Sequence, residues 1–498
     1  MTLTRENLLK LQNGSDVRGV AIDGLGEAVT LTEEAVNRIA GAFVVWLEKN
    51  CSKKAVRIGV GHDSRLSADA LSKAALKGLK SAGAQTVFCG LASTPSMFMG
   101  TVYEQTKFDG SIMITASHLP YNRNGMKFFT KDGGLEKSEI TEVLEIAATT
   151  ATAETVIDAV EKVELLQIYA ADLRQKIENG VGSQRLSGVH IVVDASNGAG
   201  GFFAKEVLEA LGADVSGSQF LEPNGHFPNH VPNPESPEAM DSLRDAVLKN
   251  KADFGLIFDP DVDRMSAVLA DGKEINRDAL IALMAAIAVK DCPGGTIVTD
   301  SVTSDTLTDF LENTLQCRHR RFKRGYKNVI NECKRLNADQ IVSPLAIETS
   351  GHGAFQENYY LDDGCYMAVK LIMAAVQEKR QGRDITALIA DLKEAYEARE
   401  YRMNIKEEDF KSYGQEVLSL FESRAKEKGI HIEPDSCEGV RLSFKGVPAG
   451  WALLRASLHD PVLALNMEGS KAGDCEAILG VIHEILADRK GIVLDNLK

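Results

Sequence analysis

The feature that most constrains the fold is an order of strands and helices that recurs three times at intervals of about a hundred residues. In each copy an apolar run breaks into a polar turn, and two more apolar runs follow, each after helix-length sequence. The copies begin at Val56–Val60, Val189–Val193 and Gly295–Thr299. Alternating strands and helices predict a mainly parallel sheet with helices on both faces. The sequence therefore predicts three similar, doubly wound α/β domains, each with a polar loop at the sheet edge where ligands bind.

Further apolar runs mark the other strands of these copies. The second and third strands are expected at Ala82–Phe88 and Ser111–Thr115, at Leu211–Val215 and Phe254–Phe258, and at Leu315–Phe322 and Gln340–Val342. Before the first copy, apolar residues at helical spacing predict a helix over Leu31–Glu48, with Thr32 as its N-cap.

The pattern changes after about residue 399. A charged helical stretch, Glu407–Lys428, precedes three short alternating runs, and a last helix is expected over Ala472–Asp488. This order is typical of a distinct α+β domain with an antiparallel sheet. With linkers expected near residues 150–160 and 395–405, the predicted domains are 1–155, 156–276, 277–398 and 399–498.

The charge balance and the cysteines narrow the class of protein. The 498 residues include 56 Lys and Arg against 71 Asp and Glu, a formal net charge of −15. This balance argues against nucleic acid or an anionic membrane as a general partner. The eight cysteines are scattered without a CxxC pair, which indicates a reducing compartment and no zinc or redox motif. No signal-peptide core and no apolar run of transmembrane length is recognisable, so a cytoplasmic protein is expected.

The most informative loop follows the apolar run Ile112–Ile114. It contains Ser117 and His118, continues with turn-forming residues, and leads to a second apolar patch that contains Lys127. Ser117 is therefore expected just past the carboxyl end of a strand, at the ligand-binding edge. Taken alone, an ordinary polar loop is the alternative.

An acidic loop follows the third strand of the second copy. Asp259, Asp261 and Asp263 alternate along it, and Arg264 comes next. Three crowded carboxylates repel one another unless a cation neutralises them, and Mg²⁺ with oxygen ligands is the simplest explanation. An acidic solvated turn is the plain alternative. A strand that ends in Asp-x-Asp is also similar to haloacid-dehalogenase-type phosphatases, in which Asp259 would be the nucleophile.

Two segments of the third copy carry groups suited to sugars and anions. Glu348, Ser350 and His352 share one glycine-containing loop and suit hydrogen bonding to sugar hydroxyls. Upstream, the densest basic run covers Arg320–Lys327 and favours either a solvated face or an anion-binding wall.

Three further motifs carry basic or glycine-rich sequence. Arg455–Pro461 follows a strand of the last domain, and its arginine suits bidentate phosphate binding. Arg18 lies in a glycine-containing turn near the N-terminus. Asn197–Gly201 is predicted to be a tight strand-to-helix turn rather than a phosphate site, because no lysine or capping hydroxyl accompanies it.

Together these residues resemble the α-D-phosphohexomutase superfamily, the phosphoglucomutase and phosphomannomutase enzymes. Thr115–Lys127 is similar to the phosphoserine loop of that family and Asp259–Arg264 to its Mg²⁺ loop. Glu348–His352 is similar to its sugar-binding loop, and Arg455–Pro461 lies where the family has its phosphate-binding loop. Asn13–Gly19 is similar to an N-terminal motif whose arginine faces the active site. The resemblance covers nearly the whole chain and implies four domains around a central cleft.

The resemblance implies an enzyme that interconverts hexose 1-phosphate and hexose 6-phosphate, of glucose or mannose, through a phosphoserine and a hexose 1,6-bisphosphate. It implies a monomer or homodimer that binds a hexose phosphate. The implied catalytic residues are Ser117, His118, Lys127, Arg18 and Arg264, with Lys127 as the general acid or base. The implied Mg²⁺ ligands are Asp259, Asp261, Asp263 and the phosphorylated Ser117. The implied substrate-binding residues are Arg324, Gly325, Tyr326, Glu348, Ser350, His352, Arg455, Ser457 and His459.

Some positions depart from the family pattern. Leu119 replaces an asparagine of the phosphoserine loop, and Ala456, His459 and Asp460 replace residues of the phosphate-binding loop. The preferred hexose phosphate is therefore open. Three alternatives accompany the main hypothesis: a phosphoglucosamine mutase, a phosphatase that uses Asp259, and a non-catalytic sugar-phosphate sensor.

Overall fold

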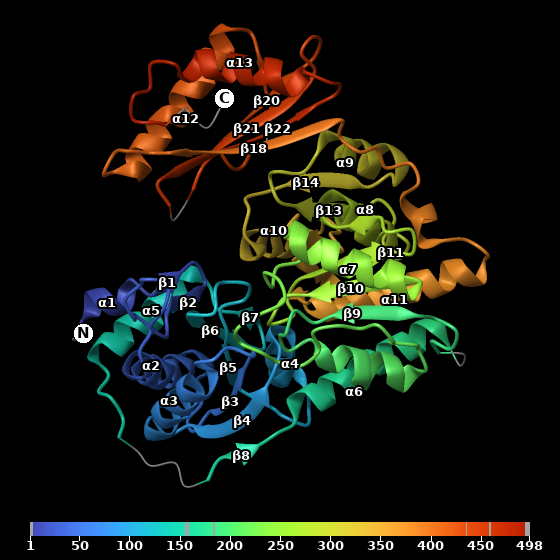
Figure 1. Cartoon of the computed structure of the whole chain (residues 1–498). Helices are drawn as coiled ribbons and strands as arrows, with labels where there is room; N and C mark the ends of the chain where they lie inside the picture. The colour runs from blue at the N-terminus through green and yellow to red at the C-terminus, as the bar shows by residue number, and fades with distance from the viewer. Residues whose placement is uncertain (1–2, 155–158, 183–184, 435, 458–459, 494–498) are drawn as a thin grey trace. The chain divides into compact units, whose positions relative to one another are not determined.

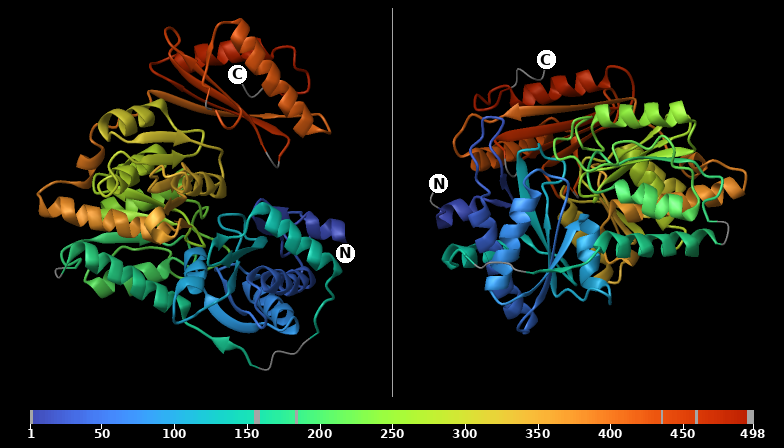
Figure 2. Two further views of the ribbon diagram at one scale, coloured as in Figure 1. Left: turned by 180° about the vertical axis from the view of Figure 1, so that it is seen from behind. Right: turned by 60° about the horizontal axis from the view of Figure 1, so that its bottom comes forward.

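The computed structural model describes residues 3–154, 159–182, 185–434, 436–457 and 460–493 (Figure 1). Within these residues the chain forms two compact units. The first contains Met1–Leu280 and Ser350–Ala387, and the second contains Ile281–Thr349 and Leu388–Lys498. Figure 2 shows the elements of each unit from two further directions.

The first unit begins with a mixed sheet in the order β1-β2-β6-β5-β3-β4-β8, with β7 paired to β6. The strands are β1 (Gln12–Asn13), β2 (Asp16–Val20), β3 (Arg57–His62), β4 (Gln85–Leu91), β5 (Gly110–Ile114), β6 (Arg123–Thr130), β7 (Gly133–Gly134) and β8 (Glu161–Lys162). Strands β3, β4 and β5 are parallel, and β6 returns antiparallel to β5. Every residue of β5 is buried, as its apolar run predicted. The first copy of the sequence pattern is therefore confirmed.

Helices cover both faces of this sheet. Helices α2, α3 and α5 share a core with one face, and α4 lies on the other (Figure 1). The helices are α1 (Arg5–Leu9), α2 (Glu33–Cys51), α3 (Ala68–Ser81), α4 (Thr94–Val102) and α5 (Lys137–Thr149). The hydroxyl of Thr32 accepts from the backbone N of Ala35 at 3.2 Å, so the predicted N-cap of α2 is confirmed.

A second sheet of the first unit has the order β12-β11-β10-β9. Strands β9 and β10 are parallel, and β11 is antiparallel to β10. The elements of this part are α6 (Leu165–Val181), β9 (Ile191–Asp194), the π-helical η1 (Phe203–Leu208), the 3₁₀ turn η2 (Glu209–Leu211), α7 (Pro237–Asn250), β10 (Phe254–Phe258), β11 (Met265–Leu269) and β12 (Glu274–Ile275). The unit also contains the antiparallel pair β16 (Gly353–Phe355) and β17 (Leu361–Asp362), the 3₁₀ turn η4 (Gln356–Asn358) and α11 (Gly364–Arg380).

The strand expected at Leu211–Val215 is wrong. Leu211 ends the 3₁₀ turn η2, and Gly212 has a φ of +88°, a left-handed conformation that ends helices. Beyond it, Asp214 makes only an isolated bridge to His190. Leu211 and Ala213 are buried at this helix end, where burial needs no strand partner.

The second unit contains β13 paired in parallel with β14 and β15. Its elements before residue 395 are β13 (Thr296–Thr299), α9 (Asp305–Asp309), the π-helical η3 (Phe310–Thr314), β14 (Arg318–Arg321), α10 (Tyr326–Ala338) and β15 (Leu345–Ile347). Two more elements each span a boundary between the units along the chain: α8 (Arg277–Ala288) and the 3₁₀ turn η5 (Ile385–Ile389).

The strand expected at Gln340–Val342 is wrong, and the strand lies instead at β15. Ile341 and Val342 are exposed because the run lies just after the end of α10, where the N of Ile341 donates back to the O of Leu336 at 2.9 Å.

The C-terminal part forms an antiparallel sheet in the order β18-β22-β21-β20-β19. Its elements are β18 (Glu397–Asn404), α12 (Phe410–Glu427), β19 (His431–Ile432), β20 (Val440–Phe444), β21 (Gly450–Ala456), β22 (Val462–Gly469) and α13 (Asp474–Leu486). Both helices share one core with the sheet, so the predicted α+β domain is confirmed. The linker expected at 395–405 is wrong, because β18 pairs with β22 along its whole length there. Its side chains are mostly exposed, which removed the apolar alternation that marks a strand.

A buried arginine joins this sheet to β13 within the second unit. Arg441 lies 3.7 Å from the centroid of the Trp451 ring and donates to the O of Ser301 at 3.2 Å. It also donates to Asp305 Oδ1 at 2.8 Å. This desolvated cation thus connects the C-terminal sheet to the loop after β13.

The eight cysteines are all free thiols. None of the described helices combines the length and the apolar character needed to cross a membrane.

Candidate active site

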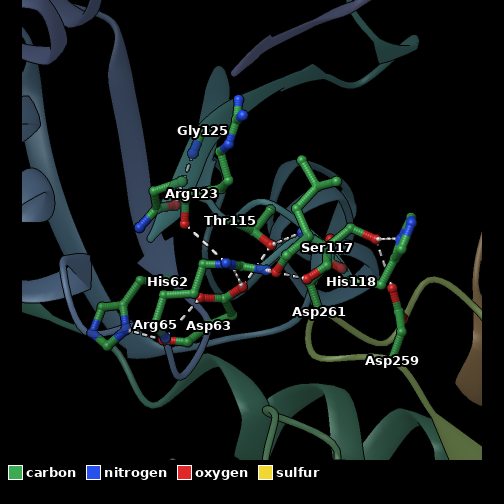
Figure 3. Close-up of polar contacts among 12 residues, drawn as sticks. His62, Asp63, Arg65, Thr115, Ser117, His118, Arg123, Gly125, Asp259 and Asp261 are labelled. Carbon is green, nitrogen blue, oxygen red and sulfur yellow. Dashed lines mark hydrogen bonds and ion pairs between the residues drawn. The ribbon is translucent and has the colours of Figure 1, made fainter. Parts of the chain in front are cut away.

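Ser117 lies in the loop between β5 and β6, where the sequence predicted it. Its φ is +52°, in the left-handed region that few residues other than glycine adopt. The Oγ donates to Asp259 Oδ2 at 2.8 Å and lies 3.2 Å from Nδ1 of His118 (Figure 3). The Ser117 amide donates to Oγ1 of Thr115 at 2.9 Å. The hydroxyl is therefore buried and directed at the acidic loop.

The acidic loop gathers its three carboxylates into one buried cluster. Asp259, Asp261 and Asp263 each offer an oxygen within 4.8 Å of the others. Lys127, on β6, donates through Nζ to Asp261 Oδ2 at 2.9 Å and also to Asp263. Thr94, the first residue of α4, donates its hydroxyl to Asp261 Oδ2 at 2.5 Å. Strand β6 thus donates to this loop through Lys127, and helix α4 through the hydroxyl and the backbone N of Thr94.

Two oxygens of the cluster have no hydrogen-bond partner within the described residues. These are Oδ1 of Asp261 and Oδ1 of Asp263, both buried. Leaving a buried acceptor unsatisfied costs about 1–3 kcal/mol or more for a charged group. Hard divalent cations take such carboxylate oxygens as ligands. The cluster therefore fits a divalent cation.

The protonation of these groups is set by burial and by their neighbours. Burial, followed by repulsion from Asp263 and Asp261, raises the pKa of Asp259 well above its ordinary value. Burial also pushes the pKa of Asp261 upward, but Lys127 and the hydrogen bond from Thr94 outweigh it and the pKa lies below the ordinary range. Burial lowers the pKa of Lys127, yet the two carboxylates raise it well above its ordinary value. Lys127 is therefore an ammonium ion in this arrangement.

His118 is a neutral imidazole beside the serine. The charge of Arg264 and burial lower its pKa well below the ordinary value, and His352 and Arg18 add to the effect. Arg18, on β2, donates to the backbone O of Thr115 at 2.5 Å. The two arginines predicted for the site therefore both act electrostatically on the histidine.

Arg264, the last residue of the acidic loop, lies next to His352. The amide of Arg264 donates to Asp259 Oδ1 at 3.2 Å, and its backbone forms an antiparallel bridge with His352. Nδ1 of His352 contacts a carboxylate oxygen of Asp362 and lies 3.8 Å from Asp263 Oδ1. His352, predicted to bind sugar, is thus paired with acids next to the candidate metal cluster.

The predicted sugar-binding loop crosses the boundary between the units. Ser350 belongs to the first, and its Oγ is buried without a hydrogen-bond partner among the described residues. Glu348 belongs to the second, where its Oε1 accepts from the backbone N of Gly325 at 2.6 Å. Gly325 is the N-cap of α10, and Tyr326 is the first residue of that helix. Two predicted substrate-binding positions, Glu348 and Gly325, therefore contact each other directly.

In the second unit, Glu438 lies close to two residues that were predicted to bind anions, Arg324 and Arg455. Its Oε2 accepts from Ser301 Oγ at 2.6 Å and from the backbone N of Arg324 at 3.1 Å. Nη1 of Arg455 lies 3.9 Å from its other oxygen. Burial and the charge of Arg324 lower the pKa of Arg455. Nε of Arg455 is buried without a hydrogen-bond partner within the part of the chain described.

The remaining predicted residues of the last domain are only partly described. Ser457 follows β21, and its Oγ accepts from the backbone N of Asp460 at 3.2 Å. His459 lies outside the described residues.

The turn at Asn197–Gly201 agrees with the structural interpretation. A Cβ on Gly198 would lie 2.3 Å from the Cα of Pro260, and a Cβ on Gly201 would lie 2.1 Å from the O of Leu221. These glycines permit close packing of backbones, so no ligand is needed to explain them.

Sequence reasoning missed the residues that hold the site in place. Asp63 and Arg65 follow β3 at the same sheet edge and contact the serine loop. Thr94 and Asp362 contact the acidic loop and His352. The polar turn after the apolar run of β3 was a signal for the first two, because it ends at the same edge as Ser117. No comparable signal marked the others.

Comparisons with known proteins agree with this architecture. Models of the phosphoglucomutase/phosphomannomutase family match α/β/α domain I at residues 9–155, domain II at 167–272 and domain III at 276–396. A phosphomannomutase/phosphoglucomutase of Pseudomonas syringae pv. tomato is 30% identical over 471 residues, which cover 94% of this chain and 93% of the relative. A phosphoglucomutase of Neisseria gonorrhoeae is 29% identical over 482 residues, covering 93% and 94%.

Solved structures share the fold. A phosphoglucomutase/phosphomannomutase family protein of Burkholderia thailandensis superposes with a TM-score of 0.79 at 24% identity, covering 99% of both chains. A structure described as a phosphomannomutase of Thermus thermophilus gives a TM-score of 0.71 at 22% identity, covering 96% of this chain and 99% of the other. With the family models matching most of its length, the chain belongs to the phosphoglucomutase/phosphomannomutase family.

Proposed function

We propose that the protein is a phosphohexomutase that interconverts hexose 1-phosphate and hexose 6-phosphate through a phosphorylated Ser117. Glucose and mannose phosphates are the proposed substrates, and a hexose 1,6-bisphosphate is the proposed intermediate and activator. The observation that carries the proposal is the 2.8 Å contact between Ser117 Oγ and Asp259, inside a buried carboxylate cluster. Two oxygens of that cluster have no hydrogen-bond partner among the described residues. Membership of the family adds independent support.

In the proposed reaction the phosphoryl group passes from Ser117 to the free hydroxyl of the bound hexose phosphate. The bond between phosphorus and Ser117 Oγ breaks, and a bond to the sugar oxygen forms. The intermediate then presents its other phosphate to Ser117, which takes it back. Such transfers need mainly positioning and charge stabilisation.

The proposed cofactor is Mg²⁺, held by Asp259, Asp261, Asp263 and the phosphorylated Ser117. When bound it would neutralise negative charge on the phosphoryl group. The donor set is all oxygen, as a hard cation requires.

Proton transfer is assigned to groups beside the serine. Lys127 is charged and its pKa is raised, so it suits neutralisation of the departing serine oxygen rather than proton abstraction. His118 is neutral and 3.2 Å from Ser117 Oγ, so it can carry the proton in both transfers. It would pass the proton of the sugar hydroxyl to the departing Ser117 oxygen in the first transfer, and the proton of Ser117 to the departing sugar oxygen in the second. We propose that Arg18 and Arg264 keep this imidazole neutral and stabilise phosphate charge.

The proposed substrate groups are those of the sugar and phosphate loops. Glu348, Ser350 and His352 would contact sugar hydroxyls. Groups proposed to hold the non-reacting phosphate are Arg324, Gly325, Tyr326, Arg455, Ser457 and His459. The Nε of Arg455, which has no hydrogen-bond partner among the described residues, supports this part of the proposal.

The alternatives have less support. A phosphatase with Asp259 as its nucleophile would leave Ser117, whose Oγ donates to that carboxylate at 2.8 Å, without a role. A sensor without catalysis would not require Lys127 buried among the acids. A probable phosphoglucosamine mutase of Methanocella arvoryzae is 27% identical over 486 residues, so glucosamine phosphate belongs in the substrate panel.

The decisive experiment is an intact-mass measurement of the wild type and of Ser117→Ala after incubation with hexose 1,6-bisphosphate. We expect a one-phosphate increment in the wild type, lost in Ser117→Ala together with mutase activity. The matched control is Ser196→Ala, because Ser196 is also buried, has a φ of +48° and follows β9. It should keep the increment. Equal mutase activity in the wild type and Ser117→Ala would refute the assignment.

Other proposals concern the whole chain. We propose four domains that divide at 155/156, at 276/277 and just before β18 (Glu397–Asn404), because the predicted boundary at 398/399 would cut that strand. We also propose a cytoplasmic location, and a monomer or homodimer. Light scattering on the purified chain and fractionation of its source cells test the last two.

A further inference from the structure

We propose that Arg65 is a positioning residue for phosphoryl transfer, because its guanidinium holds the loop of Ser117 in shape through the backbone carbonyls of that loop. The kinetic consequence rests on the proposed mutase function. The structural part, a clamp on the loop, does not depend on it.

The clamp consists of four hydrogen bonds from one side chain. Nη1 of Arg65 donates to the O of Pro120 at 2.8 Å and to the O of Arg123 at 2.9 Å. Nη2 donates to the O of Ser117 at 2.5 Å and to the O of Leu119 at 2.6 Å. Figure 3 shows the guanidinium among the residues of this loop. Arg65 therefore contacts the loop at both ends and in the middle.

The physical need for an arginine follows from the accepting groups. Four carbonyl oxygens converge on one point, and their partial negative charges repel one another unless a cation lies between them. A planar guanidinium offers five N–H donors in a fixed fork, which a lysine ammonium cannot match. The side chain is 0% exposed, so its charge needs compensation. Asp63 provides it, with Oδ2 lying 3.3 Å from Nε of Arg65.

The same pair also fixes the amide side of Ser117. Asp63 Oδ2 accepts from the hydroxyl of Thr115 at 2.7 Å, and Thr115 Oγ1 accepts from the Ser117 amide at 2.9 Å. Asp63 Oδ1 accepts from the backbone N of Arg65 at 3.0 Å. The N–H and C=O of the serine are thus both connected to the end of β3. This explains how a non-glycine residue keeps a φ of +52°, which costs of order 1–3 kcal/mol unless the surroundings enforce it.

The clamp uses the main chain of Leu119 rather than its side chain. The departure from the family pattern at this position therefore leaves the contact intact, because any residue supplies the same carbonyl. A change at Leu119 should affect loop shape far less than a change at Arg65.

The inference has a defined consequence for catalysis. Ser117 must bring its phosphoryl group to a sugar hydroxyl with little freedom, and a displacement of about 1 Å can cost about a hundredfold in rate. Arg65 contacts only backbone of the loop, so substrate affinity should change little. A loss in kcat with unchanged KM is the expected signature.

The test compares Arg65→Lys with a matched control, Arg38→Lys. Arg38 is also largely buried in the first unit and donates to main-chain carbonyls, to the O of Ala147 at 2.9 Å and to the O of Ala148 at 2.8 Å. We expect kcat of Arg65→Lys to fall about 10- to 100-fold with KM within about twofold, and kcat of Arg38→Lys to stay near wild type. Amide exchange in peptides covering residues 115–125 should rise about tenfold or more in Arg65→Lys only.

Several results would overturn the clamp: wild-type kcat and exchange in folded Arg65→Lys, equal losses in both variants, or an effect on KM alone. If Arg65→Lys does not fold, Asp63→Asn takes its place, since it keeps the shape and weakens the ion pair. It should raise exchange of the loop and lower kcat several-fold, and wild-type values would overturn the proposal. If the wild type shows no mutase activity, the proposed function has failed, and the exchange comparison alone decides the clamp.

Discussion

At the scale of single residues, the candidate site depends on one buried ammonium among buried carboxylates. Lys127 donates to Asp261 and Asp263, and the free oxygens of both acids remain for a cation. The lysine and the cation thus share the neutralisation of one cluster. Removing either should place more of the charge on the other.

Lys127→Met should lower the free energy of unfolding by about 3–5 kcal/mol in EDTA, because two buried carboxylates lose their partner. Saturating Mg²⁺ should restore part of this loss, since a ligand that binds only the folded state stabilises it. Urea denaturation with and without Mg²⁺ measures both effects.

The control for this experiment is Lys370→Met, because Lys370 is buried in the same unit and donates to Glu357 at 2.8 Å. It should lose less and show no gain from Mg²⁺ beyond that of the wild type. Equal losses without a Mg²⁺ effect would contradict the shared role.

A histidine outside the site should make stability depend on pH. Nε2 of His230 lies 3.0 Å from Oδ2 of Asp194, at the end of β9. Burial lowers the pKa of His230. The hydrogen bond to Asp194 and the charge of Asp194 together raise it by more than burial lowers it, so the pKa lies above its ordinary value. The folded state therefore binds the proton more tightly than the unfolded state. The stabilisation is complete below a pH of about 6.5 and is lost as pH rises through the raised pKa.

The measurement is the difference in free energy of unfolding between the wild type and His230→Asn across this range. The difference should shrink as pH rises. A difference that grows or stays constant would show that the imidazole is not charged in the folded protein.

The residues with distinctive chemistry could be predicted from the sequence, and those that position them could not. Ser117, Lys127 and the acidic loop stand out because hydroxyl, amine and crowded carboxylates follow apolar strands. Arg65 bonds to carbonyl oxygens more than fifty residues away, and every residue type offers a carbonyl. Nothing in the local sequence distinguishes such a partner.

At the scale of elements, strands were predictable where both faces of the sheet are covered. Strands β5 and β10 are buried along their whole length and read as continuous apolar runs. Strand β18 lies at an edge with exposed side chains, so hydrogen bonding to β22 decides its structure instead of burial. The strand predicted at Gln340–Val342 was wrong for the opposite reason, because its apolar residues Ile341 and Val342 are exposed.

Packing between helices predicts that one Gly→Ala substitution lowers stability, although helix propensity alone would predict that it raises stability. Gly→Ala inside a helix normally stabilises it by about 1 kcal/mol. In α3, a Cβ on Gly78 would lie 2.0 Å from the O of Asn37 on α2, so Gly78→Ala should destabilise the protein by about 1–3 kcal/mol. In α13, Gly480 is exposed with nothing near its Cβ position, and Gly480→Ala should be neutral or stabilising. Thermal unfolding of both variants tests the contrast, and a gain in stability from Gly78→Ala would show that α2 and α3 can separate at little cost.

At the scale of the whole molecule, the candidate metal ligands and the arginine that packs on tryptophan belong to different units. All candidate metal ligands belong to the first unit, whereas Arg441 and Trp451 belong to the second. Proteins with several domains commonly unfold in more than one step. Each unit should therefore respond to its own perturbation.

Calorimetry should resolve two transitions, of which Mg²⁺ raises the midpoint of one, because the ligand stabilises only the unit that binds it. Arg441→Met should lower the midpoint of the other, because the cation over Trp451 and its bond to Asp305 are lost. A single transition that moves with both perturbations would mean that the units unfold together.

The left-handed backbone at Ser117 also bears on which amino acid can serve as the phosphoryl carrier. The hydroxyl of threonine would accept a phosphoryl group by the same chemistry. A β-branched side chain is a steric outlier at positive φ, however, and the φ here is +52°. The main-chain conformation therefore favours serine over threonine at this position, although both hydroxyls could carry the phosphoryl group.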